Sequence, residues 1–329
     1  MVRYRKGEFH LKVIKLSFPI NRVNNEFGIP PLVMALGYFD GVHRGHQQVI
    51  LEAKRQAEQK GISSAVMTFD PHPSVVLKNQ KHVQYITPLE EKVNTIEKLG
   101  IDYLFIIHFT IDFANLLPQE FIDQYVIGLN VKHVVAGFDF TYGRMGKGTM
   151  ETLPFHSRSQ FSFTVVPKFV EGDEKVSSSR IRSLLKSGKM DELPALLGRY
   201  YTTIGRVIHG DKRGRTIGFP TANVDIVDEY IIPPTGVYAV RFQVHNTWHN
   251  GVCNAGYKPT FNKELLQLSV EVHLFDFNED IYHEEVTIEW HLYLRKEQKF
   301  SGVEQLVTQI EKDKQHALQY FEEYRQTLL

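Results

Sequence analysis

Residues 32–46 read LVMALGYFDGVHRGH, a continuous apolar run that ends in a glycine-rich loop. A run without polar alternation is typical of a strand buried on both faces, as in a parallel sheet. Residues 46–60 then place their apolar side chains on one face, which predicts a helix. This order of strand, loop and helix puts His43 and His46 at a helix N-terminus, beyond the carboxyl end of a strand.

The same alternation extends through the first half of the chain. Four more apolar runs predict strands, at residues 62–69, 101–109, 131–136 and 161–167. Amphipathic stretches separate them, and one begins with an expected capping box from Thr87 to Glu90 and ends at Gly100. We therefore expect an α/β domain whose parallel sheet has right-handed crossovers.

After residue 200 the pattern changes to short strands separated by turns. The expected strands are residues 201–208, 236–244, 248–255, 267–277 and 284–294. Such strands favour a small antiparallel barrel, and the spacing of Val303, Leu306, Val307 and Ile310 predicts a closing helix. Residues 183–198 are predicted to form a helix that joins two domains, 1–186 and 187–329. A chain of 329 residues is long enough for both.

Composition narrows the class of protein. Lys plus Arg and Asp plus Glu are both 38, so the basic surplus typical of nucleic-acid binding is missing, and we expect no nucleic-acid partner. The single cysteine, Cys253, cannot form an intramolecular disulfide and is interpreted as a small strand residue. From the charged residues 1–10 and the lack of a long apolar run, we expect neither a signal peptide nor a membrane span. We expect a cytoplasmic protein, a monomer or weak homo-oligomer.

The two histidines suit the transfer of an adenylyl group from ATP. A phosphate nucleophile is already anionic, so the site has to supply position and charge stabilisation rather than a base. Two imidazoles at a helix N-terminus can donate hydrogen bonds to phosphate oxygens. Gly37 and Gly45 let the backbone approach the ligand, whereas the alternatives are two exposed histidines or a metal pair.

A second segment fits the same reaction. Residues 176–182, VSSSRIR, precede a helix, and their hydroxyls, amides and guanidinium groups form a cradle for pyrophosphate. A serine-rich helix start is also an ordinary N-cap. Residues 137–143, GFDFTYG, are interpreted as a wall for a ring system, with a β-turn packed on the core as the alternative.

A different phosphate site is expected in the second half, where residues 210–223 read GDKRGRTIGFPTAN. Glycines and cations in one loop can form a phosphate nest, although a surface loop explains them equally well. The oxygens of Thr221 and Asn223 can orient Mg²⁺. Glu271 can accept a proton from an attacking hydroxyl, unless it is only a solvated strand residue.

The motifs together resemble a known family. GYFDGVHRGH with SSSRIR looks like the HxGH nucleotidyltransferase superfamily, which implies a Rossmann-like first domain. FDPHP (69–73), TPLEEK (87–92) and GFDFTYG resemble the bacterial bifunctional riboflavin kinase/FMN adenylyltransferase, or FAD synthetase, family. The resemblance implies that ATP and its phosphates contact Gly37, Phe39, Asp40, Gly45, Asp139, Ser177, Ser178 and Ser179, with His43, His46 and Arg182 catalytic. It assigns Phe69, Pro71, His72 and Pro73 to the flavin.

The second half resembles the riboflavin kinase domain. Residues 210–223, GVYAV (236–240), GVCNAGYKPTF (251–261) and VEVHLFDF (270–277) carry this resemblance, which implies a six-stranded Greek-key barrel. Mg²⁺–ATP would then be held by Thr221 and Asn223, and Glu271 would be the base for riboflavin. The remaining implied contacts are phosphate-loop residues Gly210, Lys212, Gly214, Thr216 and Gly218, and flavin residues Arg295 and Phe300.

Some positions depart from the commonest family pattern. Ser179 replaces Thr, Cys253 and Lys258 replace Ala and Arg, and Asp139 stands where some members have Asn. Asp139 is the departure expected to affect adenylyl transfer. The implied substrates and products are riboflavin, FMN, FAD, ATP, ADP and pyrophosphate. The alternatives are a nucleotidyltransferase for another acceptor, and a flavin-binding regulator without turnover.

Overall fold

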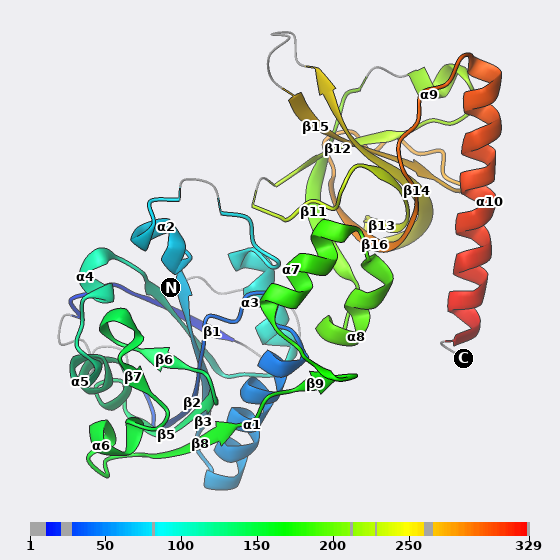
Figure 1. The fold of residues 1–329 in the computed structure, drawn as a ribbon. Coiled ribbons are helices and arrows are strands. Elements are labelled where there is room, and N and C mark those ends of the chain that lie inside the picture. The colour runs from blue at the N-terminus through cyan, green and yellow to red at the C-terminus, as the bar shows by residue number, and fades with distance from the viewer. Residues whose placement is uncertain are drawn as a thin grey trace. The chain divides into compact units, whose positions relative to one another are not determined.

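The chain divides into two units, residues 1–178 and 179–329, and each is described here by itself (Figure 1). The computed structural model describes residues 11–20, 28–80, 83–210, 213–227, 229–259 and 266–327. The division at residue 186 that the sequence suggests stays a prediction, because α7 (Ser178–Ser187) runs across both places.

Six parallel strands form the centre of the first unit, which confirms the predicted α/β sheet. In sheet order they are β1 (Lys12–Leu16), β4 (Tyr103–His108), β3 (Ser63–Asp70), β2 (Leu32–Leu36), β5 (Val131–Gly137) and β8 (Ser162–Val166). The chain moves from β2 through β3 to β4 and then returns to the other side of β2 with β5. This reversal opens a crevice at the carboxyl ends of β2 and β5, where open α/β sheets bind ligands.

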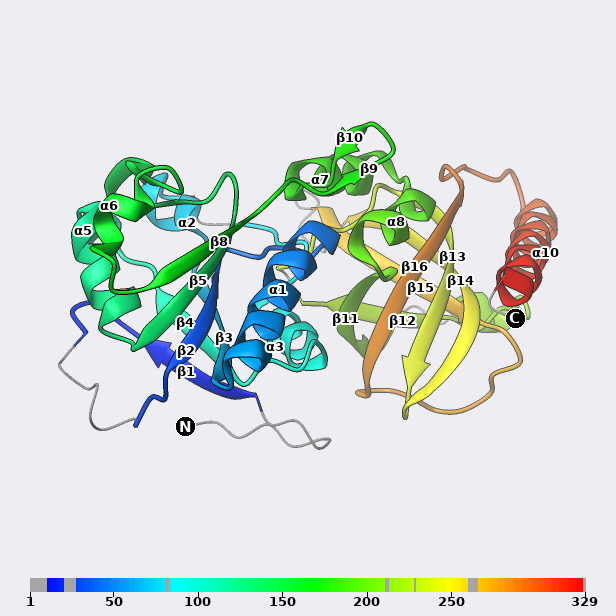
Figure 2. The same cartoon turned by 90° about the horizontal axis from the view of Figure 1, so that it is seen from below.

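Layers of helices cover both faces of this sheet (Figure 2), and an apolar cluster lies on each face. One layer contains α1 (Arg44–Lys60), which buries the residues predicted for its inner face, Val49, Ile50, Ala53 and Ala57, together with α3 (Leu89–Lys98). The other contains α4 (Ile111–Ala114), α5 (Pro118–Phe121), the π-helix η1 (Ile122–Ile127) and α6 (Leu153–Ser157). The shorter elements are α2 (Pro73–Leu77), β6 (Thr141–Tyr142), η2 (Arg144–Gly146), β7 (Gly148–Thr149), β9 (Val170–Glu171) and β10 (Glu174–Lys175).

Two predictions about helix starts need correction. The first helix begins at Arg44, because the side chain of His43 caps it. The capping box from Thr87 to Glu90 does not form: Pro88 is the N-cap without a side-chain bond, and the Thr87 amide donates to Asp40 instead. Gly100, with φ of 73°, follows the end of α3 as predicted.

The second unit is a closed six-stranded antiparallel barrel, as predicted. Its strands are β11 (Tyr201–Ile208), β12 (Ala222–Ile226), β15 (Leu266–Leu274), β14 (Thr247–Pro259), β13 (Gly236–Val244) and β16 (Glu285–Arg295), in barrel order. The predicted helix α10 (Val303–Thr327) packs Ala317 and Phe321 on the barrel. Its first apolar residue, Val303, is exposed, so the buried face begins later along the helix.

The predicted single helix over residues 183–198 is wrong. Residues 178–197 form three short pieces, α7, the 3-10 helix η3 (Met190–Glu192) and α8 (Leu193–Leu197). Gly188 has a φ of 75°, a left-handed conformation that ends α7. The remaining helix is α9 (Arg213–Thr216), which lies in the glycine-rich loop before β12.

Candidate functional site

The loop between β2 and α1 is shaped by its glycines. A side-chain carbon on Gly37 would lie 2.6 Å from the ring of Phe39, so the close approach of this ring requires glycine. Phe39 adopts a φ of 56°, and its ring packs edge-on against His46, with centroids 5.3 Å apart. A side-chain carbon on Gly45 would lie 3.3 Å from the His43 ring. Gly37, Phe39 and Gly45 thus fix the turn that presents both histidines.

His43 and His46 lie together, as the sequence predicts. Their rings stack with centroids 3.5 Å apart and an angle of 16° between planes. Nδ1 of His43 accepts a hydrogen bond from the His46 amide at 3.2 Å, so the neutral ring carries its proton on Nε2. Nε2 is therefore the nitrogen of the neutral ring that can donate a hydrogen bond.

The second imidazole has an unsatisfied nitrogen. Nδ1 of His46 is buried without a hydrogen-bond partner among the described residues, a state that disfavours the folded protein by roughly 1–3 kcal/mol. Burial, followed by the charges of His43, Lys92 and Lys175, lowers the pKa of His46 well below its ordinary value. The ring is therefore neutral at pH 7, and a bound ligand can satisfy its nitrogen.

Asp40 links this loop to two other segments. Its Oδ1 accepts hydrogen bonds from the amides of Ile86 and Thr87, at 3.1 and 3.2 Å. Its backbone oxygen accepts a hydrogen bond from the Ser178 hydroxyl at 3.0 Å. The structure thus brings the start of the predicted serine cradle, Ser177 and Ser178, to the histidine loop. Ser179 and Arg182 belong to the second unit.

The Asp139 carboxylate is paired with a lysine that the sequence did not indicate. Nζ of Lys175, on β10, lies 2.5 Å from Oδ2 of Asp139 and 4.7 Å from the ring centre of Phe138. Both ionic side chains are partly exposed. This pair offsets the negative charge that the departure at residue 139 would otherwise place near an anionic nucleotide.

The FDPHP segment divides between core and site. Phe69 packs with Phe109 and Phe113 in the aromatic core, with ring centres 6.3 and 5.8 Å apart. His72 instead caps α2 by accepting the Ser74 amide at 3.0 Å, and Tyr38 packs edge-on against it at 4.6 Å. The loop around His72, bordered by Pro71 and Pro73, therefore adjoins the histidine loop, whereas the Phe69 ring packs among core aromatic rings.

The barrel brings the predicted kinase residues together. Asn223 on β12 pairs directly with Glu271 on β15, so their side chains share one face of the barrel wall. The Ser269 hydroxyl donates to Oε1 of Glu271 at 3.1 Å. A side-chain carbon on Gly210 would collide with the Asn223 side chain, so this position requires glycine.

The glycine-rich loop also encloses Thr221. A side-chain carbon on Gly214 would meet the backbone oxygen of Phe219 and lie 3.6 Å from Oγ1 of Thr221. Gly218 has a φ of 87°, and Thr216 is exposed. Lys212 lies outside the described residues, so its predicted phosphate contact remains a prediction.

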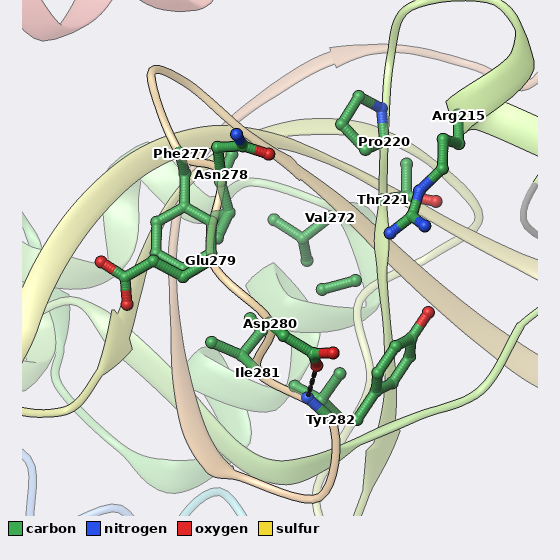
Figure 3. Close-up of a pocket in the computed structure, with 13 residues that line it drawn as sticks. Arg215, Pro220, Thr221, Val272, Phe277, Asn278, Glu279, Asp280, Ile281 and Tyr282 are labelled. Carbon is green, nitrogen blue, oxygen red and sulfur yellow. Dashed lines mark hydrogen bonds between the residues drawn. The ribbon is translucent and has the colours of Figure 1, made fainter.

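A pocket of about 400 Å³ adjoins this loop (Figure 3). Arg215 and Thr221 lie on one side of it and the segment from Phe277 to Ile281 lies on the other, with Val272 between them. The ring of Tyr282 returns to the side of Arg215 and Thr221. The segment is held in shape by Asp280, whose Oδ1 accepts the Tyr282 amide at 3.1 Å. Phe277 ends the VEVHLFDF segment, but no sequence motif singled out residues 278–282 as part of a site, because only the folded barrel returns them to Thr221.

Arg295 and Phe300 also lie together, and the structure adds a third residue. The guanidinium of Arg295 makes a bidentate ion pair with Asp313 of α10, at 2.8 Å from Nε to Oδ1 and 2.7 Å from Nη2 to Oδ2. Asp313 is buried, and the Arg295 guanidinium lies 5.9 Å from the ring centre of Phe300. The helix therefore fixes the predicted flavin-side arginine.

Within residues 11–20, 28–80, 83–210, 213–227, 229–259 and 266–327, no cluster of three or more His, Cys, Asp or Glu side chains could hold a metal ion. In the same part of the chain, none of the helices has the length and apolarity that a membrane crossing demands.

Comparison with known proteins assigns both halves. The model of the FAD synthetase family matches residues 29–180, and that of the riboflavin kinase family matches residues 197–321. The bifunctional riboflavin kinase/FMN adenylyltransferase of Bacillus subtilis is 54% identical and aligns over 96% of this chain and all of its own. The protein of the same name from Escherichia coli K12 is 35% identical, over 88% of this chain and 92% of its own.

A solved structure is also similar over almost the whole chain. A crystallised protein from Streptococcus pneumoniae, described as a macrolide-efflux protein, has a TM-score of 0.83 at 33% identity, covering 92% of this chain and 97% of its own. The two family matches occupy consecutive parts of one chain, and the full-length relatives carry both names. The chain therefore belongs to the bifunctional riboflavin kinase/FMN adenylyltransferase family.

Proposed function

We propose that the chain makes FAD from riboflavin in two reactions, each carried out by one of the two residue sets described above. The second unit phosphorylates riboflavin with ATP to give FMN and ADP. The first unit joins FMN to the adenylyl group of a second ATP and releases pyrophosphate. The observation that carries this proposal is the pairing of Asn223 with Glu271 in one unit and the stacking of His43 on His46 in the other.

In the adenylyl transfer, an oxygen of the FMN phosphate attacks the α-phosphorus of ATP. A new P–O bond forms as the bond to the β-phosphate breaks, and pyrophosphate leaves with the electron pair. His43 donates from Nε2 to a phosphate oxygen, and the buried nitrogen of His46 gains a partner at the same time. The Ser178 hydroxyl stabilises the histidine loop by donating a hydrogen bond to the backbone oxygen of Asp40. Arg182 and Ser179 stay predicted partners of the departing pyrophosphate.

In the kinase reaction, Glu271 takes the proton of the riboflavin 5′-hydroxyl, whose oxygen attacks the γ-phosphorus of ATP. ADP leaves as the bond to the β-phosphate breaks. The hydroxyl of Thr221 and the amide oxygen of Asn223 suit Mg²⁺, which takes few protein ligands and several phosphate or water oxygens. When bound, Mg²⁺ would neutralise charge on the transferred phosphate. The pocket beside Thr221 is large enough for part of a nucleotide, and Arg215 adds positive charge there.

Arg295 and Phe300 form the proposed riboflavin side of the kinase site. Replacing Asp313 with Asn removes the charge that orients Arg295, so we expect the KM for riboflavin to rise by about tenfold, the effect of losing one charge-assisted hydrogen bond, with a smaller change in kcat. Steady-state kinetics of FMN formation measures both. An unchanged KM would remove Arg295 from the flavin site. Glu304→Gln, on an exposed turn of the same helix, is the matched control.

The proposal is tested by a time course. The purified full-length chain is incubated with riboflavin, ATP and Mg²⁺, and the flavins are separated by chromatography. FMN should appear first and then give way to FAD. FMN that accumulates without FAD would remove the adenylyl assignment, and FAD formed from supplied FMN but not from riboflavin would remove the kinase assignment. Binding of flavin without any product would overturn both.

A further inference from the structure

Lys92 on α3 is a buried charged residue to which the two reactions above assign no role. Only 2% of its surface is exposed, which is unusual for a lysine. Its Nζ donates to the backbone oxygen of Tyr38 at 3.0 Å and lies 3.5 Å from the hydroxyl oxygen of Thr68. It also lies 4.3 Å from the ring centre of Tyr38, a cation–π contact.

These contacts place the ammonium group at the carboxyl ends of β2 and β3, where the histidine loop begins. Tyr38 follows β2, and Thr68 lies near the carboxyl end of β3. The Thr68 hydroxyl also donates to the Tyr38 oxygen at 2.8 Å, so this one peptide is held from two sides. Phe39, the next residue, packs against His46, and the Tyr38 ring packs against His72. The Tyr38 peptide thus lies between the nucleotide loop and the loop assigned to the flavin.

The charged groups around Lys92 come from three elements. Asp40 in the loop and Asp70 on β3 raise the pKa of the amine, but its burial outweighs them and lowers the pKa to about 8. On the other side, the positive charge of Lys92 helps to lower the pKa of His46 on α1. At pH 7 the site therefore holds the Lys92 cation beside the neutral imidazole of His46, an arrangement suited to an anionic substrate.

One donor of Lys92 remains available. An ammonium group has three N–H donors, and within the described residues two oxygens accept from it. Burying such a charge disfavours the folded state, and an apolar residue of similar length would not carry that cost. A role in the reaction would explain why an amine, rather than an apolar side chain, is buried at this position.

We propose that Lys92 is a positioning residue for adenylyl transfer, whose ammonium group fixes the Tyr38 peptide and adds positive charge beside the phosphate site. The proposal rests on the adenylyl reaction assigned above to the first unit. Under this proposal, the geometry of the histidine loop, which precedes α1, depends on Lys92 of α3. It also predicts that adenylyl transfer requires Lys92 in its protonated form.

The test uses the full-length chain and its Lys92→Met and Lys92→Arg variants. The quantities measured are kcat and KM for ATP in FAD formation from supplied FMN, between pH 6.5 and 9.5, and FMN formation from riboflavin. Thermal unfolding followed by circular dichroism reports whether the first unit of each variant is folded, and kinase turnover in the same sample reports the state of the second unit. Lys54→Met is the matched control. Lys54, on α1, also donates to a backbone oxygen of the first unit, that of Leu99 at the end of α3.

We expect Lys92→Met to lower kcat/KM for ATP by about 10- to 100-fold, the range for losing a charged hydrogen bond, with kinase turnover unchanged. The value of kcat/KM reports groups of the free enzyme. For the parent chain it should be full below pH 8 and fall above it, as Lys92 loses its proton. Lys92→Arg should keep a reduced rate without that fall, because a guanidinium stays charged.

Two results would overturn the proposal. One is a Lys92→Met chain that forms FAD at the parent rate. The other is a fall above pH 8 that persists unchanged in Lys92→Arg, since it would then belong to another group. Failure of the adenylyl assignment itself looks different, because the parent chain would then form no FAD from FMN at any pH.

Discussion

His46→Ala is expected to slow FAD formation from FMN by about 10²- to 10³-fold, as losing one donor to a developing phosphate charge does in other enzymes. The imidazole is held between the His43 ring and the edge of Phe39, so no neighbouring side chain replaces it. His43→Ala should have an effect of similar size and also remove the cap of α1. Riboflavin phosphorylation by the same protein should stay unchanged.

The measurement is the initial rate of FAD formation with saturating FMN and varied ATP. His133→Gln is the matched control, since His133 is another buried histidine of the first unit. Its ring nitrogens are hydrogen-bonded to Ser162 and Thr164 of β8, an outermost strand of the sheet. It should change stability but leave the rate intact. If the His46 variant keeps the parent rate, the histidine loop is not the adenylyl site.

Glu271→Gln is expected to lower FMN formation from riboflavin by about 10²- to 10⁴-fold, the contribution of a general base. The amide has the same shape and still accepts from Ser269, but it cannot take the proton of the 5′-hydroxyl. FAD formation from supplied FMN should be preserved, which is the reverse of the His46 result. The two variants mixed together should restore the full conversion, because FMN made by one is the substrate of the other.

The rate of FMN formation is measured with saturating Mg²⁺ and ATP. Glu285→Gln provides the control: this exposed glutamate lies on β16, a barrel strand that pairs with neither β12 nor β15. A Glu271→Gln chain that phosphorylates riboflavin at the parent rate would show that another group accepts the proton. The juxtaposition with Asn223 would then serve the nucleotide alone.

The sequence predicts those parts of the fold that local pattern specifies. Continuous apolar runs identified five of the six parallel strands, but β1 was missed because its residues KVIKL carry two lysines at the edge of the sheet. β12 is not among the strands that the pattern predicts, because the glycines and the Pro-Thr-Ala-Asn motif before it outweigh its short apolar pattern. Both strands are defined by long-range pairing.

In the candidate site, too, the residues that belong to local motifs are predictable, and those defined by long-range packing are not. The glycines, His43, His46, Asn223 and Glu271 belong to motifs, so they could be singled out before the fold was known. Lys92 is the last residue of the TPLEEK segment, but nothing in that segment indicates its partner, and Lys175 and Asp313 are ordinary charged residues in sequence. Only the packing of α3, β10 and α10 brings each to a site residue. A pattern within one segment carries no information about such partners.

The direct pairing of Asn223 with Glu271 has a consequence for how the barrel can vary. Successive side chains of a strand point to opposite faces, so deleting one residue from β12 or β15 would turn one partner inward and the other outward. Insertions can therefore accumulate in the loops that connect these strands, but not within them. For this reason the spacing of the two motifs along the chain is free to change, whereas their alignment across the ladder is not.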